Sequence, residues 1–272
     1  MKPSSTIYRT MFAAILGFAL LSYLYPLAYM VFRSVLAYEP GMASGKILLT
    51  FDHYREILGK AGFPRFVFNS VLVLFLVVPC NAIFATMVGY AFSRYKFPIK
   101  KVLFLIVLAT LMVPKQTLMI PILDVSVRLN LHDTLWILII PFIIDSFNIF
   151  LMKQYIDSLP SDLEDAARVD GASEFQILRS VIFPLCKPAL AIVVINTAIV
   201  TWNSFLFPLI LTDSTTNRTL PVGLAMFVQG PHSTDWGALM AGATISSLPM
   251  IVIFFIFQRE IIEGITAGAL KD

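Results

Sequence analysis

The sequence predicts an all-α integral membrane protein with six membrane-spanning helices. Hydrophobic residues make up 58% of the 272 residues, charged residues make up only 14%, and the mean hydropathy is +0.81. This composition is too apolar for a soluble chain of this length. The apolar residues form continuous runs of roughly 20 residues, the length a helix needs to cross about 30 Å of hydrocarbon. Because the runs do not alternate with a period of two, we expect helices and not barrel strands.

The six spans are predicted to belong to one domain that covers residues 1–272. The first could be mistaken for a signal peptide, because Lys2 and Arg9 precede it. Its apolar stretch is too long for a signal core and no small-residue cleavage site follows, so we expect a retained helix. The prolines within the spans each invite a kink; they are Pro26, Pro79, Pro114, Pro121, Pro141, Pro208 and Pro249. The spans are predicted at residues 11–32, 66–93, 102–123, 134–152, 188–211 and 236–257.

Lysine and arginine indicate the orientation, because they collect in short cytoplasmic loops. With six spans, 12 of the 20 basic residues fall on the side of the N-terminus and eight on the other. Four of the 12, Arg94, Lys96, Lys100 and Lys101, share one short loop. Both termini and the polar segment 153–187 are therefore predicted to be cytoplasmic.

The polar segment 153–187 is predicted to contain two short helices. Ser161 and Glu164 have the spacing of a capping box, which predicts a helix that begins at residue 162. Gly171 is expected to end this helix in a left-handed conformation. Ser173 and Gln176 repeat the capping pattern and predict a second helix. The apolar residues expected on one face are Leu163, Ala166 and Ala167 in the first helix, and Phe175, Leu178 and Ile182 in the second.

This segment also resembles a known motif. Asp165-Ala166-Ala167, Gly171 and Val181-Ile182-Phe183-Pro184 have the spacing EAA-x3-G-x9-I-x-L-P of the EAA loop in permease subunits of binding-protein-dependent ABC importers. Asp replaces Glu, Val replaces Ile and Phe replaces Leu. Residues 66–272 are similar to the MalG-type carbohydrate permeases as a whole. That similarity includes Arg168 to Ser173, Trp202-Asn203, Phe205 to Leu209, Thr219 to Leu224, Asp235-Trp236-Gly237 and Gly264 to Ala269.

The resemblance implies a type I ABC importer permease in a bacterial or archaeal cell (inner) membrane. It implies a second, homologous permease subunit as a heterodimer partner, two ATPase subunits that bind ATP and Mg, and an extracytoplasmic solute-binding protein. The loop 161–184 would be the cytoplasmic coupling element that docks on an ATPase subunit. An amphipathic helix on lipid headgroups is the alternative, but the acidic loop suits an anionic leaflet poorly. The coupling residues implied are Glu164, Asp165, Ala166, Ala167, Asp170, Gly171 and Pro184.

Nothing in the sequence indicates an enzyme or a cofactor site. The stretch Gly41 to Ile47 is the nearest approach to a P-loop, and it lacks the required spacing and hydroxyl. His53, His132 and His232 are isolated in the sequence, and no catalytic residue, metal site or nucleic-acid partner is expected. Cys80 lies within the predicted span 66–93 and Cys186 lies in the segment 153–187, so the predicted topology separates them and no disulfide is expected.

Polar residues within the spans are candidates for a transport path. A carboxylate such as Asp145 is costly in hydrocarbon and should face protein, water or a partner charge. Asparagines and an aromatic ring suit sugar hydroxyls and a pyranose face, although they can equally hold helices together. Lys115 is expected either to snorkel to the outer headgroups or to line the pathway. The candidates are Asp145, Asn148, Asn196, Trp202 and Asn203.

Two outer segments, 33–65 and 212–235, are expected either to meet the binding protein or to be plain connectors. A stand-alone secondary transporter that uses Asp145 for ion coupling is the alternative function, and a scaffold or channel is compatible with composition alone. The solute itself is not determined by the sequence, because the resemblance implies that a separate binding protein selects it.

Overall fold

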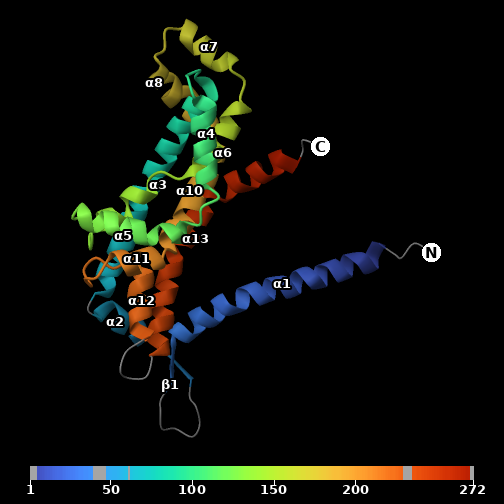
Figure 1. The fold of residues 1–272 in the computed structure, drawn as a ribbon. Coiled ribbons are helices and arrows are strands. Elements are labelled where there is room, and N and C mark those ends of the chain that lie inside the picture. Colours follow the sequence, from blue (N-terminus) through green and yellow to red (C-terminus); the bar gives the residue numbers. More distant parts are fainter. Residues whose placement is uncertain (1–4, 39–46, 61, 229–234, 270–272) are drawn as a thin grey trace. The chain divides into compact units, whose positions relative to one another are not determined.

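The structure, a computed structural model, describes residues 5–38, 47–60, 62–228 and 235–269 (Figure 1). Contacts divide the chain into two compact units. The first unit comprises Met1–Pro64 and Gly223–Leu248, and the second comprises Arg65–Val222 and Pro249–Asp272. The prediction of a single domain over 1–272 stays a prediction.

The first unit begins with α1 (Ser5–Ser34), which matches the predicted span 11–32 and continues through Pro26. None of its apolar window is buried in this chain, as expected for a helix surrounded by lipid or by another subunit. A two-stranded antiparallel ribbon, β1 (Leu36–Tyr38) and β2 (Ile47–Leu49), leads to α2 (Asp52–Gly59). Ile57 of α2 packs beside Phe63, and both side chains are fully buried. The unit also includes the later part of α12 (Leu220–Val228) and the first part of α13 (Trp236–Ala269).

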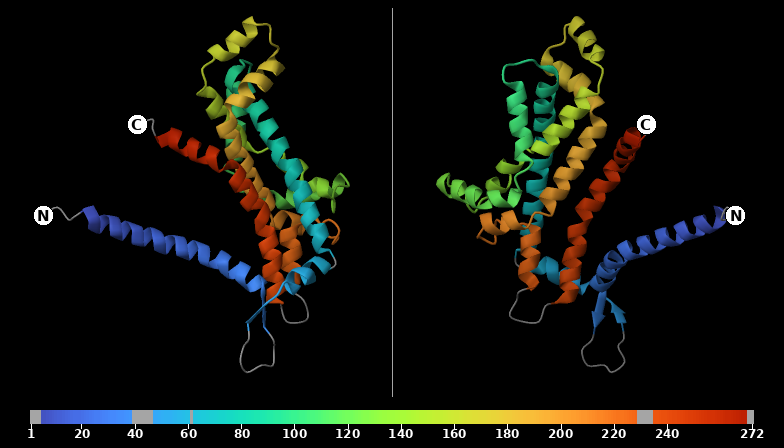
Figure 2. Two further views of the ribbon diagram at one scale, coloured as in Figure 1. Left: turned by 180° about the vertical axis from the view of Figure 1, so that it is seen from behind. Right: turned by 45° about the vertical axis from the view of Figure 1, so that its right-hand side comes forward.

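The second unit is built on α3 (Phe63–Arg94), α4 (Lys100–Thr110), α6 (Ser146–Asp157) and α10 (Lys187–Trp202). These helices run side by side, as two views in Figure 2 show. Their shared core contains Tyr90, Met152, Ile156 and Val193. Gly89 permits the closest approach, because a Cβ there would lie 2.9 Å from the Cβ of Met152.

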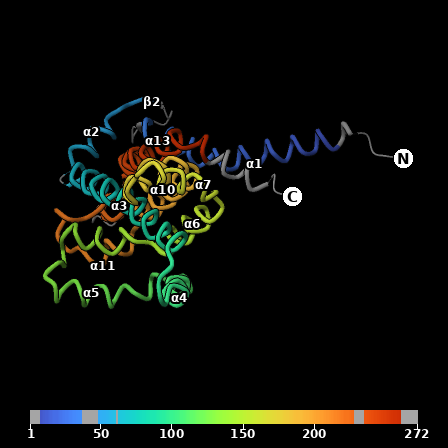
Figure 3. Tube along the Cα trace, turned by 90° about the horizontal axis from the view of Figure 1, so that it is seen from above, coloured from blue at the N-terminus to red at the C-terminus, as the bar shows by residue number. Residues whose placement is uncertain are grey.

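A second core cluster joins α3 to several short elements. It includes Val77, Ile137 and Leu211. The short elements are two 3-10 turns, η2 (Leu135–Leu138) and η3 (Ile140–Phe142), and α11 (Leu206–Leu211). Figure 3 shows α5 (Met119–Arg128) beside α11 and turned away from the axis of α4.

The six predicted spans are recovered with two changes in geometry. Four helices in the described residues are long and apolar enough to cross a membrane, and up to six spans result if each of two bent helix pairs counts as one. These pairs are Lys100–Thr110 with Lys115–Arg128, and Glu174–Leu185 with Lys187–Trp202, which meet at 81°. The predicted span 102–123 is divided at Pro114, where α4 and the 3-10 turn Lys115–Leu118 with α5 meet at 96°. The predicted span 188–211 is interrupted after Trp202 and resumes with α11 at Leu206. The all-α, multi-span fold class is confirmed.

The remaining span boundaries shift outward. The span predicted at 66–93 is part of α3, and Pro79 does not break it. The span predicted at 134–152 starts with the 3-10 turns and ends with α6 at Asp157. The last span, predicted at 236–257, continues as α13 to Ala269 through Pro249.

The two helices predicted in the segment 153–187 are present. α7 (Asp162–Val169) begins at the predicted residue, and Gly171 follows with a φ of +82°. α8 (Glu174–Ile177) begins with the capping box of Ser173 and Gln176. A π turn (Leu178–Ile182) and α9 (Phe183–Leu185) then lead to α10.

Two details of this segment were predicted wrongly. The side chain of Ser161 makes no cap hydrogen bond, because its backbone is already helical, with φ −71° and ψ −19°. Glu164 does not return to the helix start, because it turns inward and pairs with Arg94. Phe175 is exposed, whereas Leu178 and Ile182 are buried. The buried face of the second helix is centred on Ile177 and Leu178, and Phe175 lies outside this face.

Candidate functional site

Two adjoining cavities with mainly apolar walls and several polar side chains lie among the helices of the second unit. The larger has a volume of about 430 Å³ and the smaller about 350 Å³. Lys115 lines both, together with Phe142 and Thr201. Asp145, Asn148 and Asn196 line the larger cavity, and Asn203 lines the smaller. Four of the five candidate path residues are therefore brought to one connected polar region.

Lys115 and Asp145 form an ion pair at this region. The Lys115 Nζ lies 2.5 Å from Oδ2 of Asp145. The other oxygen of Asp145 accepts hydrogen bonds from the backbone N–H groups of Phe147 at 3.0 Å and Asn148 at 3.3 Å, so this carboxylate also caps α6. Asp145 thus meets a partner charge, as predicted. Lys115 lines both cavities, which is the second of the two roles considered for it.

Asn148 is the centre of a buried hydrogen-bond network. Its side-chain amide donates to Oδ1 of Asn81 at 2.7 Å and to Oγ1 of Thr197 at 2.9 Å. Its own Oδ1 accepts from the amide of Asn196 at 3.2 Å. The network links α3, α6 and α10 across buried positions, where each lost hydrogen bond leaves an unpaired polar group. Asn148 therefore holds helices together, which is one of the two roles considered for these asparagines.

The remaining candidates separate into two groups. Asn203 is exposed to the smaller cavity, and its amide also donates to the carbonyl of Ile199 at 3.0 Å. Trp202 is buried with 3% exposure and lines neither cavity, so the structure does not bring it to the site. Asn81 and Gln116 line the site and were missed. Asn81 could have been predicted from the sequence, because it is an amide in the middle of an otherwise apolar span.

The loop 161–184 is fastened to the helix bundle by a buried ion pair. Nε of Arg94 lies 2.6 Å from Oε1 of Glu164, and a terminal nitrogen of Arg94 donates to the carbonyl of Leu159 at 2.9 Å. Glu164 is only 1% exposed. The hydroxyl of Tyr90 donates to the other oxygen of Glu164 at 3.3 Å. Glu164 is thus an internal anchor of the loop and is not part of its exposed surface.

A second carboxylate fastens the two loop helices to each other. Glu174 accepts hydrogen bonds from Arg168 at 2.9 Å, from Tyr95 at 2.7 Å and from Tyr90 at 3.1 Å. These donors, Arg168 foremost, lower the pKa of Glu174 to about 2. Arg168 also donates to Asp165 at 2.8 Å. The loop is therefore a folded element with a fixed shape at neutral pH.

The outer surface of the loop is unusually apolar for so polar a segment. Val169 is 89% exposed, Phe175 67% and Leu163 47%. Most of the predicted coupling residues share this exposure: Asp165, Ala166, Asp170, Gly171 and Pro184 are exposed, and Ala167 is half-buried. Figure 1 shows α7 and α8 at the end of the second unit, beyond α3, α4 and α6. A rigid element with exposed apolar side chains has the properties of a protein docking surface.

The six candidate spans, the polar region among the helices and the rigid loop define a multi-span membrane transport subunit. The comparisons with known proteins agree with this class. Residues 81–266 match the family of binding-protein-dependent transport system inner membrane components, and the chain belongs to that family.

Individual relatives cover nearly the whole chain. It is 34% identical to the arabinooligosaccharides transport system permease protein AraQ of Halalkalibacterium halodurans, over 94% of this chain and 95% of the relative. It is 33% identical to the trehalose/maltose transport system permease protein MalG of Thermococcus litoralis, over 82% of this chain and 81% of the relative. Among solved structures, a bacterial ABC transporter involved in the import of the acidic polysaccharide alginate superposes with a TM-score of 0.82 at 26% identity. That match covers 96% of this chain and 99% of the other.

Proposed function

We propose that this chain forms half of the translocation path for a sugar or oligosaccharide in an ATP-driven importer. It is a transport subunit and not an enzyme. The cavities support a carbohydrate cargo, because amides, hydroxyls and an ion pair among apolar walls suit sugar hydroxyls and ring faces. The named cargoes of relatives, arabinooligosaccharides and trehalose or maltose, belong to the same chemical class.

The observation that carries this proposal is the loop 161–184. It has the spacing of the EAA motif, a fixed shape and exposed apolar side chains. We assign its docking partner as an ATPase subunit in the cytoplasm, which would hold the ATP and Mg. Leu163 and Val169 are surrounded by carboxylates and by Arg168. These charges would pair with charges on the ATPase subunit and so fix the position of the loop on it.

The remaining assembly follows from the same assignment. A second, homologous permease would complete the path as a heterodimer partner, and an extracytoplasmic binding protein would deliver the cargo. Both termini would be cytoplasmic, in the inner membrane of a bacterium or archaeon. The outer segment 212–235 would meet the binding protein; residues 229–234 of it lie outside the described residues. The alternative of an ion-coupled transporter loses its main support, because the charge of Asp145 is already neutralised by Lys115.

The experiment that tests this function is purification of the chain after co-expression with the genes beside its own. We expect a nucleotide-binding subunit and a second permease to copurify. We also expect proteoliposomes of this complex to take up an oligosaccharide only with ATP and the binding protein. Uptake by the chain alone, driven by an ion gradient, would contradict the proposal.

The ion pair at the cavity makes a separate prediction. In Asp145→Asn, the amide still caps α6 but the ammonium of Lys115 loses its partner beside the path. We expect normal amounts of the assembled complex. The uptake rate should fall about tenfold, which corresponds to a rise of about 1.4 kcal/mol in the activation free energy of transport. The measurement is initial uptake per mole of complex. The double variant Lys115→Met/Asp145→Asn, which removes both charges, is the control and should recover part of the rate; uptake that Asp145→Asn leaves unchanged would refute this role.

A further inference from the structure

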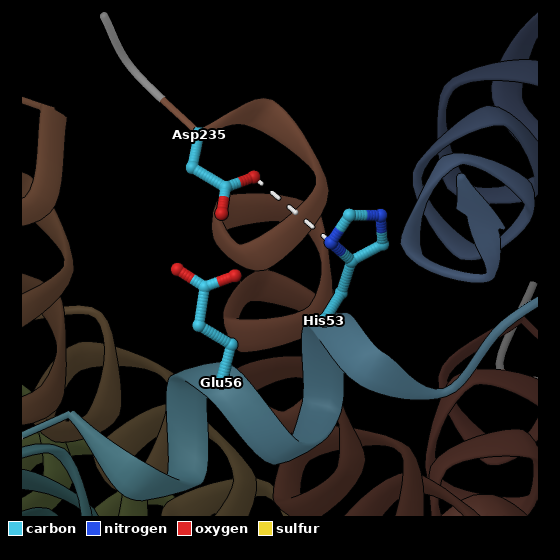
Figure 4. Close-up of side chains that lie close together, drawn as sticks. All are labelled: His53, Glu56 and Asp235. Atoms are coloured by element: carbon cyan, nitrogen blue, oxygen red, sulfur yellow. Dashed lines mark ion pairs between the residues drawn. The ribbon is translucent and has the colours of Figure 1, made fainter. Parts of the chain in front are cut away.

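A cluster of metal-ligand side chains lies in the first unit, whereas the cavities and the loop belong to the second. His53 and Glu56 are three residues apart on α2 and therefore share one helix face. Asp235 immediately precedes α13. One imidazole nitrogen and one carboxylate oxygen from each acid all lie within 4.8 Å of one another. Figure 4 shows the three side chains converging from the two elements.

The orientation of His53 is fixed by contacts outside the cluster. Its Nε2 lies 3.0 Å from the carbonyl oxygen of Leu36, which can only accept, so Nε2 carries the proton and donates it. In the neutral ring, Nδ1 then presents its lone pair, and this atom lies 4.0 Å from Oδ1 of Asp235. Metal-binding histidines usually donate their other ring N–H to a carbonyl or carboxylate in this way.

The backbone of α13 supports the same orientation. Any Cβ at residue 237 would overlap the imidazole ring of His53, so Gly237 lets the ring lie directly against the start of α13. The backbone N–H of Ala238 donates a hydrogen bond to Oδ1 of Asp235 at 3.0 Å, which holds this carboxylate at the start of α13.

We propose that His53, Glu56 and Asp235 bind one divalent transition-metal ion of the Zn²⁺ class. Ligand atoms about 2.0 to 2.2 Å from one zinc ion lie at most about 4.4 Å apart. The observed separations need only a small rotation of Glu56, which is the most exposed of the three. Water would complete the coordination. The bound ion would tie α2 to the start of α13.

The choice of ion follows from the ligands. Imidazole nitrogen favours zinc and its neighbours over Ca²⁺ and Mg²⁺, which prefer oxygen throughout. Lys60 is the local competitor, because its Nζ lies 3.2 Å from Oε1 of Glu56. The ammonium stabilises the carboxylate pair in the absence of metal and repels an incoming cation.

The test measures Zn²⁺ binding to the complex that contains the full chain, purified through a tag without histidine. Equilibrium dialysis at neutral pH should find about one more equivalent of zinc per chain in the wild type than in His53→Ala, with no competition from Ca²⁺ or Mg²⁺. Asp235→Asn, which preserves shape, should weaken this binding by more than about tenfold. His132→Ala/His232→Ala is the matched control: it leaves His53 as the sole histidine of the chain and should keep full binding.

A charge variant gives a result of the opposite sign. Lys60→Met retains the aliphatic stem and removes the competing ammonium, which lies 5.5 Å from the centre of the Phe227 ring. We expect zinc to bind about threefold to tenfold more tightly. Equal zinc content in the wild type and His53→Ala, or affinity that Lys60→Met leaves unchanged, would overturn the proposal. Recovery of the intact complex on size exclusion excludes misfolding as the cause.

Discussion

Replacing Arg94 by methionine is expected to destabilise the protein by about 3 to 5 kcal/mol, because it leaves the buried Glu164 without its nearest positive charge. Arg168 lies 3.8 Å from Glu164 and compensates poorly. Since α7 is fastened to the bundle through this pair, the loop should detach first. We expect a lower thermal unfolding temperature of the solubilised complex, faster proteolysis between residues 161 and 184, and loss of uptake.

A second variant separates the charge from the shape. In Arg94→Met/Glu164→Met, both members of the pair become apolar and of similar length, and such replacements of buried ion pairs are often neutral in stability. The double variant should regain most of the unfolding temperature lost in Arg94→Met. If the single and double variants are equally unstable, the buried charge is not the cause and the pair is not the anchor of the loop.

Replacing Gly171 by valine is expected to abolish transport while the chain still inserts into the membrane. Gly171 has a φ of +82°, a conformation that costs a β-branched residue more than the roughly 1 to 2 kcal/mol typical of L-residues. The strain would be relieved by turning α7 relative to α8, which changes the surface offered to the ATPase subunit. The measurement is ATP-driven uptake together with copurification of the ATPase subunit.

The matched control for this position is Gly171→Asn. A Cβ at residue 171 would meet no atom within 4 Å, so only the backbone conformation restricts the side chain. Asparagine tolerates the left-handed conformation better than other residues, and this variant should retain most of the transport. Equal activity of the valine and asparagine variants would show that the left-handed turn is not needed for coupling.

The features that the sequence predicts correctly are those set by short-range interactions. The start of α7 at residue 162, the turn at Gly171 and the capping box of Ser173 and Gln176 depend on residues within a few positions of each other. The bend at Pro114 has the same origin. The break after Trp202 was not predicted, because only Asn203 and Ser204 interrupt the apolar residues on either side of it.

The sequence by itself determined the membrane-spanning class, the positions of the spans and the two loop helices. Composition and short-range spacing are sufficient for these features. Tertiary structure alone decided the partners of the polar side chains: Glu164 pairs with Arg94 70 positions away, Asn148 with Asn81 67 positions away, and Asp145 with Lys115 30 positions away. It also brought Asp235 to His53 and Glu56, which share one face of α2. A buried polar group must find a partner, but helix packing decides which distant residue comes within reach.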